Sequence, residues 1–370
     1  MRGENPLQAP VDVAVVVQTI LRPTLMRAVR SIFAQTFTGR IQILIGVDIG
    51  DRSLPFLDRL REECPSHVIL TVIDPGYSTS RRHGGLYSNF YGGALRTVLS
   101  YLANSRYVAY LDDNDWYARD HLAELRRTIE GQDWAFSNRW LVDPETAWPI
   151  CRDEWDSLGP GLGINASDFG GFVQPSTLMI DKIACRSVLP LWSQAAFPDG
   201  GGEDRLIFAA LTGRFGASAG KGFRGAGSGR HSCFCMLNDE SIHHRHHTRE
   251  FEARGLFWVE DRLQIDRIRV DLAQACDHEK AGAFAEAAAA CRRALALNPY
   301  SAEALDRLAR IEAVSGDLAT ALLYAEQAVE IDDGPECNAT LAEIRRNATP
   351  SDFPSDPSSV SAGGRRFRRV

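Results

Sequence analysis

An acidic run, Asp112-Asp113-Asn114-Asp115, is the sharpest chemical signal in the sequence. It follows the apolar stretch Tyr107–Leu111, which predicts a buried strand that ends where the acids begin. Three carboxylates in four positions repel one another unless a cation neutralises them, and carboxylate oxygens are ligands that Mg²⁺ and Mn²⁺ prefer. Aspartate is also common in turns and at helix N-caps. The run therefore predicts either a divalent-cation site or a capped acidic turn.

Two further clusters contain residue types suited to chemistry. Glu203 and Asp204 follow three glycines, where they suit either a general base or the N-terminus of a helix, whose dipole favours acidic residues. The segment His243–His247 contains four histidines. Two imidazoles three or four residues apart can share a metal ion, whereas adjacent histidines in a loop are usually solvated. His244 is the best single candidate for a ligand.

The elements that must position these residues follow an alternating pattern. Apolar, β-branched runs predict strands, and apolar residues at helical spacing predict helices between them. The predicted strands are Val11–Val17, Ile41–Asp48, Val68–Ile73 and Tyr107–Leu111, and the predicted helices are Leu25–Gln35, Leu54–Cys64 and Gly92–Asn104. This order predicts a parallel, doubly wound sheet, in which ligands bind at the carboxyl ends of the strands. Thr19, Asp48 and Asp112 stand at such ends.

After Leu111 the pattern becomes looser. Short strands are predicted over Trp134–Trp140, Gly171–Ile180 and Ser232–Met236, separated by Gly, Pro and Asp. The stretch Gly216–Gly229 is rich in glycine and has few apolar residues, which predicts a mobile loop.

Several segments show a family resemblance through their order and spacing. They are Thr19–Leu25 with Ala28–Ile32 and Gln35–Thr36, then Asp48, Ser80–Asn89, the acidic run and Glu203–Asp204. Together they resemble the GT-A-fold glycosyltransferases of family 2, and the likeness covers roughly Val11 to Phe257. The resemblance implies an α/β catalytic domain of the GT-A, Rossmann-like type with a mostly parallel mixed sheet.

The same resemblance implies roles for the matching residues. By this likeness the donor-binding residues are Thr19, Asp48, Arg82, Asp112 and Asp113, the metal ligands are Asp113, Asp115 and His244, and the catalytic residues are Asp204, as base, and Glu203, which positions the base or the acceptor. The acidic run departs from the family's frequent Asp-x-Asp-Asp order, so Asp113 and Asp115 can exchange roles.

The region after about Arg262 changes to Ala, Leu, Glu and Arg and contains an internal repeat. Gly282, Phe284 and Ala287 recur 34 residues later as Gly, Leu and Ala. This helix–turn–helix period resembles the tetratricopeptide repeat. The repeat units are predicted at Ile268–Ser301 and Ala302–Pro335, followed by a capping helix over Glu336–Asn347.

These patterns predict four parts of the chain. Residues 1–10 form an N-terminal extension, and 11–257 a glycosyltransferase domain with a nucleotide-sugar half, 11–115, and an acceptor half, 116–257. Residues 262–347 form an all-α domain of helical repeats, and 348–370 a disordered basic tail.

Composition excludes other classes of protein. The 370 residues are 44% hydrophobic and 24% charged, as in globular proteins, and the net charge of -7 argues against nucleic acid as the main partner. No apolar run approaches the ~20 residues of a membrane span, and no signal peptide is expected. The eight cysteines contain no C-x-x-C pair, so reduced thiols are expected. We expect a cytoplasmic protein, or one peripheral at the inner face of the membrane.

The sequence and the resemblance together predict a metal-dependent, inverting, hexosyltransferase-like enzyme. It would move a sugar from a nucleotide-diphosphate sugar, with UDP-sugars favoured, to a hydroxyl of a saccharide or protein, using Mn²⁺ or Mg²⁺. The resemblance suggests bacterial polysaccharide or glycoprotein biosynthesis, with the repeats binding a protein partner or a second copy. The alternative is a tetratricopeptide scaffold whose nucleotide-sugar-binding domain is not catalytic.

Overall fold

The computed structural model describes residues 9–50, 56–89, 92–216, 220–237, 242–254 and 262–348. The chain divides into two compact units, of which the first comprises Met1–Ala147 and Cys151–Asn238 and the second comprises Trp148–Ile150 and Asp239–Val370. We call them the α/β unit and the helical unit. Residues 255–261, where the sequence predicts a domain boundary, lie outside the described residues, as does most of the predicted extension and tail.

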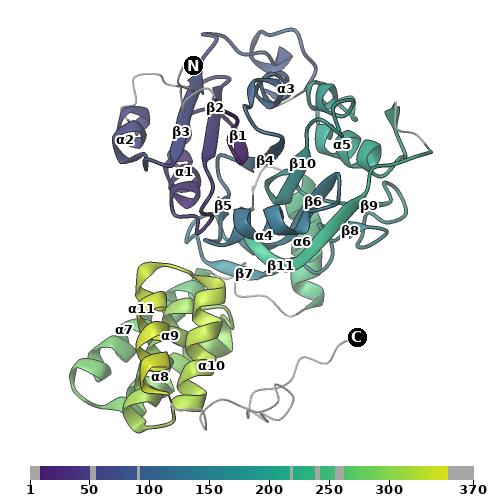
Figure 1. The fold of residues 1–370 in the computed structure, drawn as a ribbon. Coiled ribbons are helices and arrows are strands. Elements are labelled where there is room, and N and C mark those ends of the chain that lie inside the picture. The colour runs from purple at the N-terminus through teal and green to yellow at the C-terminus, as the bar shows by residue number, and fades with distance from the viewer. Residues whose placement is uncertain are drawn as a thin grey trace, which may run out of the picture. The chain divides into compact units, whose positions relative to one another are not determined.

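Strands and helices alternate through the first part of the chain (Figure 1). The strands are β1 (Val13–Thr19), β2 (Ile41–Val47), β3 (Val68–Ile73), β4 (Tyr107–Asp112), β5 (Trp116–Tyr117), β6 (Trp134–Val142), β7 (Pro149–Arg152), β8 (Gly159–Pro160), β9 (Gly171–Phe172), β10 (Leu178–Asp181) and β11 (Gly225–Met236). The helices are α1 (Leu25–Phe33), α2 (Phe56–Glu63), α3 (Gly93–Leu102), α4 (His121–Thr128) and α5 (Glu203–Leu211), with short 3₁₀ segments η1 (Arg81–His83), η2 (Pro175–Thr177) and η3 (Leu189–Ser193).

The main sheet runs in the order β3-β2-β1-β4-β10-β6-β11-β5. The first four strands are parallel, β10 is antiparallel to both of its neighbours, β11 is parallel to β6, and β5 is antiparallel to β11. Register pairs Gln18 of β1 with Asp112 of β4, and Thr19 with Val47 of β2. The predicted mixed, mostly parallel α/β sheet is confirmed, and the ends of β1, β2 and β4 are level.

Apolar side chains cover both faces of this sheet. Successive residues of β1 alternate between two core clusters, with Val15 in one and Val16 in the other. Helices α1, α2 and α4 contribute to the first cluster, and α3, α5 and η3 contribute to the second. Burial on both faces explains why these strands are continuous apolar runs in the sequence.

Two local predictions for the α/β unit are wrong. The predicted strand Gly171–Ile180 is divided into β9 and β10 by η2. Pro175 has no N–H to donate to a neighbouring strand, and the Gln174 side chain caps η2. The predicted loop over Gly216–Gly229 is wrong for its last five residues, which belong to β11. A Cβ at Gly225 would lie 2.1 Å from the Trp134 ring, so glycine there allows a close contact with an aromatic ring.

The helical unit confirms the predicted all-helical C-terminal region (Figure 1). Its helices are α6 (Ile242–Ala253), α7 (Arg262–Lys280), α8 (Phe284–Leu297), α9 (Ala302–Ser315), α10 (Leu318–Ile331) and α11 (Pro335–Asn347). Each predicted repeat contains a helix pair, α7 with α8 and α9 with α10. The interpretation of His243–His247 as a loop is wrong, because these residues belong to α6. Among the described helices, none is both long and apolar enough to cross a bilayer.

The turn between α9 and α10 depends on glycine. Gly316 caps α9 with φ 88°, and a Cβ there would meet no atom within 4 Å. Gly316→Ala is therefore expected to lower the free energy of unfolding of the helical unit by about 1 kcal/mol, from backbone strain alone. Urea denaturation of the full chain measures this loss. Gly316→Asn is the control and should lose less, because asparagine tolerates this conformation. An alanine variant as stable as the parent would contradict this explanation.

Candidate active site

The turn after β1 wraps around the carboxylate of Asp113. Thr19 Oγ1 donates to Asp113 Oδ2 at 2.7 Å, and Arg22 Nη1 lies 2.8 Å from Asp113 Oδ1. The backbone N–H of Leu21 donates to Thr19 Oγ1 at 2.8 Å. Leu21 has φ 60°, a conformation that leucine rarely adopts. The predicted donor-binding residues Thr19 and Asp113 are thus in direct contact.

The neighbouring carboxylate, Asp112, is held by two residues that the sequence analysis missed. Arg96 of α3 places Nη2 2.5 Å from Asp112 Oδ1, and Gln174 Nε2 donates to Oδ2 at 3.2 Å. The Arg96 side chain is only 2% exposed, and its guanidinium lies over the Trp192 ring. Neither residue had a local signal in the sequence: Arg96 lies beside the apolar positions of its helix and not among them, and Gln174 lies far along the chain from the acidic run.

Asp115 points into the protein. Its carboxylate accepts hydrogen bonds from Ser176 Oγ at 2.7 Å, Gln174 Nε2 at 3.1 Å and the Met236 N–H at 3.0 Å. Burial, together with the negative charge of Asp112, raises the pKa of Asp115 to about 7. Gln174 contacts both Asp112 and Asp115 and so joins them, whereas Asp113 has its own separate donors.

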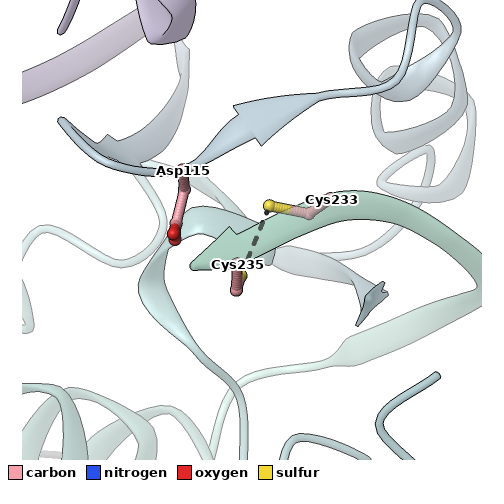
Figure 2. Close-up of side chains that lie close together, drawn as sticks. All are labelled: Asp115, Cys233 and Cys235. Carbon is pink, nitrogen blue, oxygen red and sulfur yellow. Dashed lines mark hydrogen bonds between the residues drawn. The ribbon is translucent and has the colours of Figure 1, made fainter. Parts of the chain in front are cut away.

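Asp115 also lies beside two cysteines of β11 (Figure 2). Alternate strand positions put Cys233 and Cys235 on one face, with their sulfurs 3.7 Å apart. Within the described ranges, this is the one group of three His, Cys, Asp or Glu side chains whose ligand atoms lie within 4.8 Å of one another. Burial raises the pKa of both thiols, and soft sulfur ligands do not suit Mg²⁺ or Mn²⁺. The cluster does not fit the predicted cation.

The predicted metal ligands are not gathered at one point. Asp113 and Asp115 make separate sets of hydrogen bonds, and the side chain of His244 lies outside the described residues. The oxygen atoms of Asp112 and Asp113 do fit a hard cation in type. The Asp112 side chain is 31% exposed, and Asp113 already attracts the positive group of Arg22. A cation would meet this pair at the sheet edge.

A pocket of about 590 Å³ opens beside the end of β2. It is lined by Asp48, Ile49, Gly76, Tyr77, Ser78, Thr79, His83, Gly84, Gly85, Leu86 and Tyr87. The buried carboxylate of Asp48 accepts from Ser78 Oγ at 2.8 Å and from the Thr79 N–H at 2.9 Å. Asp48 therefore fixes the shape of one wall. Arg82 lies in η1, next to the lining residue His83.

Glu203 and Asp204 begin α5, directly after Gly202 with φ 82°. The predicted alternative, a helix N-terminus, is confirmed, and such a position does not exclude a role as base. Burial and the charge of Asp204 raise the pKa of Glu203 to about 7, while Arg96 opposes that rise. Glu203 is thus near enough to Arg96 for the two charges to interact. The carboxylate of Asp204 accepts from the Arg205 N–H at 2.7 Å.

A column of stacked side chains supports the segment after the acidic run. Arg27 lies over the Trp116 ring at 3.8 Å, and Trp116 stacks on Phe234 at 5.3 Å. Phe234 stacks in turn on Trp140, over which Arg152 lies. This column packs β5 against β11. Because Trp116 directly follows Asp115, the same packing helps to fix the position of Asp115.

Comparisons with known proteins give distant structural likenesses. No family model matches the sequence, and no curated protein matches it. S. aureus TarS 1–349 in complex with UDP-GlcNAc is 14% identical, with TM-score 0.41 over 92% of this chain and 93% of that one. The mannosyltransferase PcManGT from Pyrobaculum calidifontis, in complex with GDP-Man and Mn²⁺, is 14% identical, with TM-score 0.41 over 92% of this chain and 88% of that one.

A longer crystal structure of S. aureus TarS is 12% identical with TM-score 0.41, and the match spans 55% of that chain. TM-scores this low do not establish a common fold. The arrangement of this chain's own residues is what bears on its chemistry.

Proposed function

We propose that the α/β unit is a metal-dependent, inverting glycosyltransferase of the family 2, GT-A type. One observation supports this most. The level ends of β1, β2 and β4 bring Thr19, Asp48 and the pair Asp112–Asp113 to one edge of the sheet, beside a pocket of about 590 Å³. Ligands of open α/β sheets bind at this edge, and the volume suits a nucleotide.

In this proposal, the pocket beside Asp48 binds the nucleoside of a nucleotide-diphosphate sugar, with UDP favoured. Tyr77 and Tyr87 line the pocket and offer aromatic faces for a base. Asp48 keeps the wall in place through Ser78 and Thr79, so its contribution is at least partly to position the loop. Thr19 and Arg82 are proposed to bind the donor on its phosphate side.

Asp113 is proposed to hold Mn²⁺ or Mg²⁺, with Asp115 and His244 as further candidate ligands, and Asp112 is proposed to contact the donor. An ion bound there would neutralise charge on the diphosphate as it departs. Arg96 and Gln174 position Asp112, and the buried carboxylate of Asp115 is already engaged by three donors. Asp113 is the leading candidate for the metal, because one of its donors is Arg22, whose side chain is 39% exposed.

The two carboxylates at the start of α5 are proposed to serve the acceptor. Asp204, as base, takes the proton of the acceptor hydroxyl while that oxygen bonds to the anomeric carbon of the sugar. The bond from that carbon to the diphosphate breaks, and its electron pair leaves with the diphosphate. Attack from the face opposite the leaving group inverts the configuration. Glu203 is proposed to position Asp204 or the acceptor.

The helical unit is proposed to be a tetratricopeptide module that binds an acceptor protein, a partner enzyme or a second copy. Paired helices that expose a long surface are used in this way in repeat proteins. The acceptor itself is proposed to be a saccharide or a protein hydroxyl. The enzyme is proposed to be cytoplasmic or peripheral at the inner face of the membrane.

A thermal-shift screen tests the donor assignment. UDP-GlcNAc, UDP-glucose and GDP-mannose would each be added to the full chain with and without Mn²⁺. Saturation with the correct donor is expected to raise Tm by several degrees, and more with Mn²⁺ than without. Hydrolysis of that donor, measured as UDP or GDP release, then separates an enzyme from a scaffold that only binds. Unchanged Tm with all three donors, with and without Mn²⁺, would contradict the proposal.

A further inference from the structure

We propose that Arg22 is a built-in competitor of the divalent cation at Asp113. In the ligand-free protein its guanidinium occupies the carboxylate, and it must withdraw before a cation can bind there. The inference rests on the proposed function, because it assigns the cation to Asp113. It adds a positioning residue that controls when the cation binds.

The Asp113 carboxylate is already engaged. Both oxygens are taken by the chain's own donors, since Thr19 Oγ1 lies 2.7 Å from Oδ2 and Arg22 Nη1 lies 2.8 Å from Oδ1. The Asp113 side chain is 4% exposed. A positive ion approaching Oδ1 from the sheet edge would meet another positive charge already in place.

Arg22 is able to leave Asp113. Its side chain is 39% exposed, and in the described part of the chain Asp113 is the one carboxylate with which it pairs. Ion pairs with an exposed partner are weak, because water screens the attraction and the long side chain loses freedom. Asp113, by contrast, is fixed by Thr19 and cannot follow the guanidinium outward.

The backbone just before Arg22 has an unusual conformation. Leu21, the residue before it, has φ 60°, with its N–H bonded to Thr19 Oγ1 and its side chain buried. Leucine rarely adopts this conformation, so the packing of the turn must hold it there. The Thr19 hydroxyl thus donates to Asp113 and also accepts from the Leu21 N–H, which holds the backbone that leads to Arg22.

A consequence for binding follows. A diphosphate arriving at this edge offers the guanidinium a second anionic partner. Withdrawal of Arg22 then frees Asp113 for the cation, so nucleotide and cation should each increase the affinity of the other by the same factor. The ligand-free enzyme would hold a divalent ion weakly and the nucleotide-bound enzyme would hold it tightly.

Mn²⁺ binding to the full-length protein tests this inference without any turnover. Free Mn²⁺ is counted by its electron paramagnetic resonance signal, in the absence and in the presence of UDP. Arg22→Gln is expected to lower the Kd for Mn²⁺ without UDP by about fivefold, the equivalent of about 1 kcal/mol for a lost exposed pair. The factor by which UDP tightens Mn²⁺ binding should shrink in the same variant.

Arg30→Gln is the matched control. Arg30 lies in α1, a few residues further along, and pairs with Glu63 at 2.7 Å, away from the acidic run. It should leave both Kd values unchanged. Equal Mn²⁺ affinity in Arg22→Gln and the parent would overturn the inference while leaving the proposed function intact, provided that UDP still promotes Mn²⁺ binding. If the parent binds no Mn²⁺ with or without UDP, both proposals fail.

Discussion

Replacing Asp113 with asparagine is expected to lower kcat/KM for sugar transfer by about 10² to 10³-fold, the usual loss when a group that stabilises transition-state charge is removed. The amide keeps an oxygen that can accept from Thr19 Oγ1, which donates at 2.7 Å in the parent, so the turn should remain folded. The variant loses the negative charge that attracts a divalent ion. Steady-state release of UDP, measured over a range of Mn²⁺ concentrations, gives the loss and shows whether it is partly recovered at high metal.

Asp12→Asn is the control for this variant. Asp12 precedes β1 at the opposite end of that strand, where its carboxylate accepts from the Arg40 N–H at 2.7 Å. Loss of a carboxylate there should leave turnover unchanged. If Asp113→Asn kept most of the parent's kcat/KM and the same Mn²⁺ dependence, the metal would have to be assigned elsewhere.

Replacing Asp204 with asparagine is expected to lower kcat by about 10² to 10⁴-fold, the range for loss of a general base. An amide cannot accept the acceptor's proton, while the hydrogen bond from the Arg205 N–H can be retained by its oxygen. Donor affinity should change little, because Asp204 is not one of the proposed donor contacts. Initial rates with saturating donor, combined with calorimetric binding of UDP, separate these two effects.

Glu203→Gln is the companion experiment, because Glu203 is also a candidate for the general base. Its pKa is raised to about 7 by burial and by Asp204. A base must be deprotonated to act, so a base with that pKa would make kcat/KM fall as the pH drops below about 7. If Asp204 is the base, Glu203→Gln retains most activity and only shifts the pH profile. A larger loss in Glu203→Gln than in Asp204→Asn would reverse the assignment.

The parallel half of the sheet was predictable because its strands are buried on both faces. Strands such as Val13–Thr19 and Ile41–Val47 are continuous apolar runs, without the alternation of apolar and polar residues seen in half-buried strands. Because the strands are parallel, the residues at their carboxyl ends lie at one edge of the sheet. The sequence therefore located Thr19, Asp48 and the acidic run correctly as neighbours. The inward direction of the Asp115 side chain was not predictable from the sequence. Neighbouring side chains in a turn point in different directions, so residue order alone does not show which carboxylate faces solvent.

Residues that support the site from distant parts of the chain were harder to find. Gln174 joins Asp112 to Asp115 across about sixty positions, and nothing in its local sequence marks it as a partner of an acidic run. The glycines of β11 misled for a different reason. Their missing side chains make room for the rings of Trp134 and Phe136, so a composition typical of a loop occurs in an ordered strand.

The position of β3 at the end of the sheet has a practical consequence for handling the protein. Its six residues, Val-Ile-Leu-Thr-Val-Ile, are uncharged, and within the described residues no strand pairs with its outer side. Such a segment can pair with a strand of another molecule when partial unfolding exposes it. Asp74 and Pro75, directly after it, limit how far such pairing can spread. Mild heating or dilute denaturant should therefore produce aggregation that depends on protein concentration and begins at this edge.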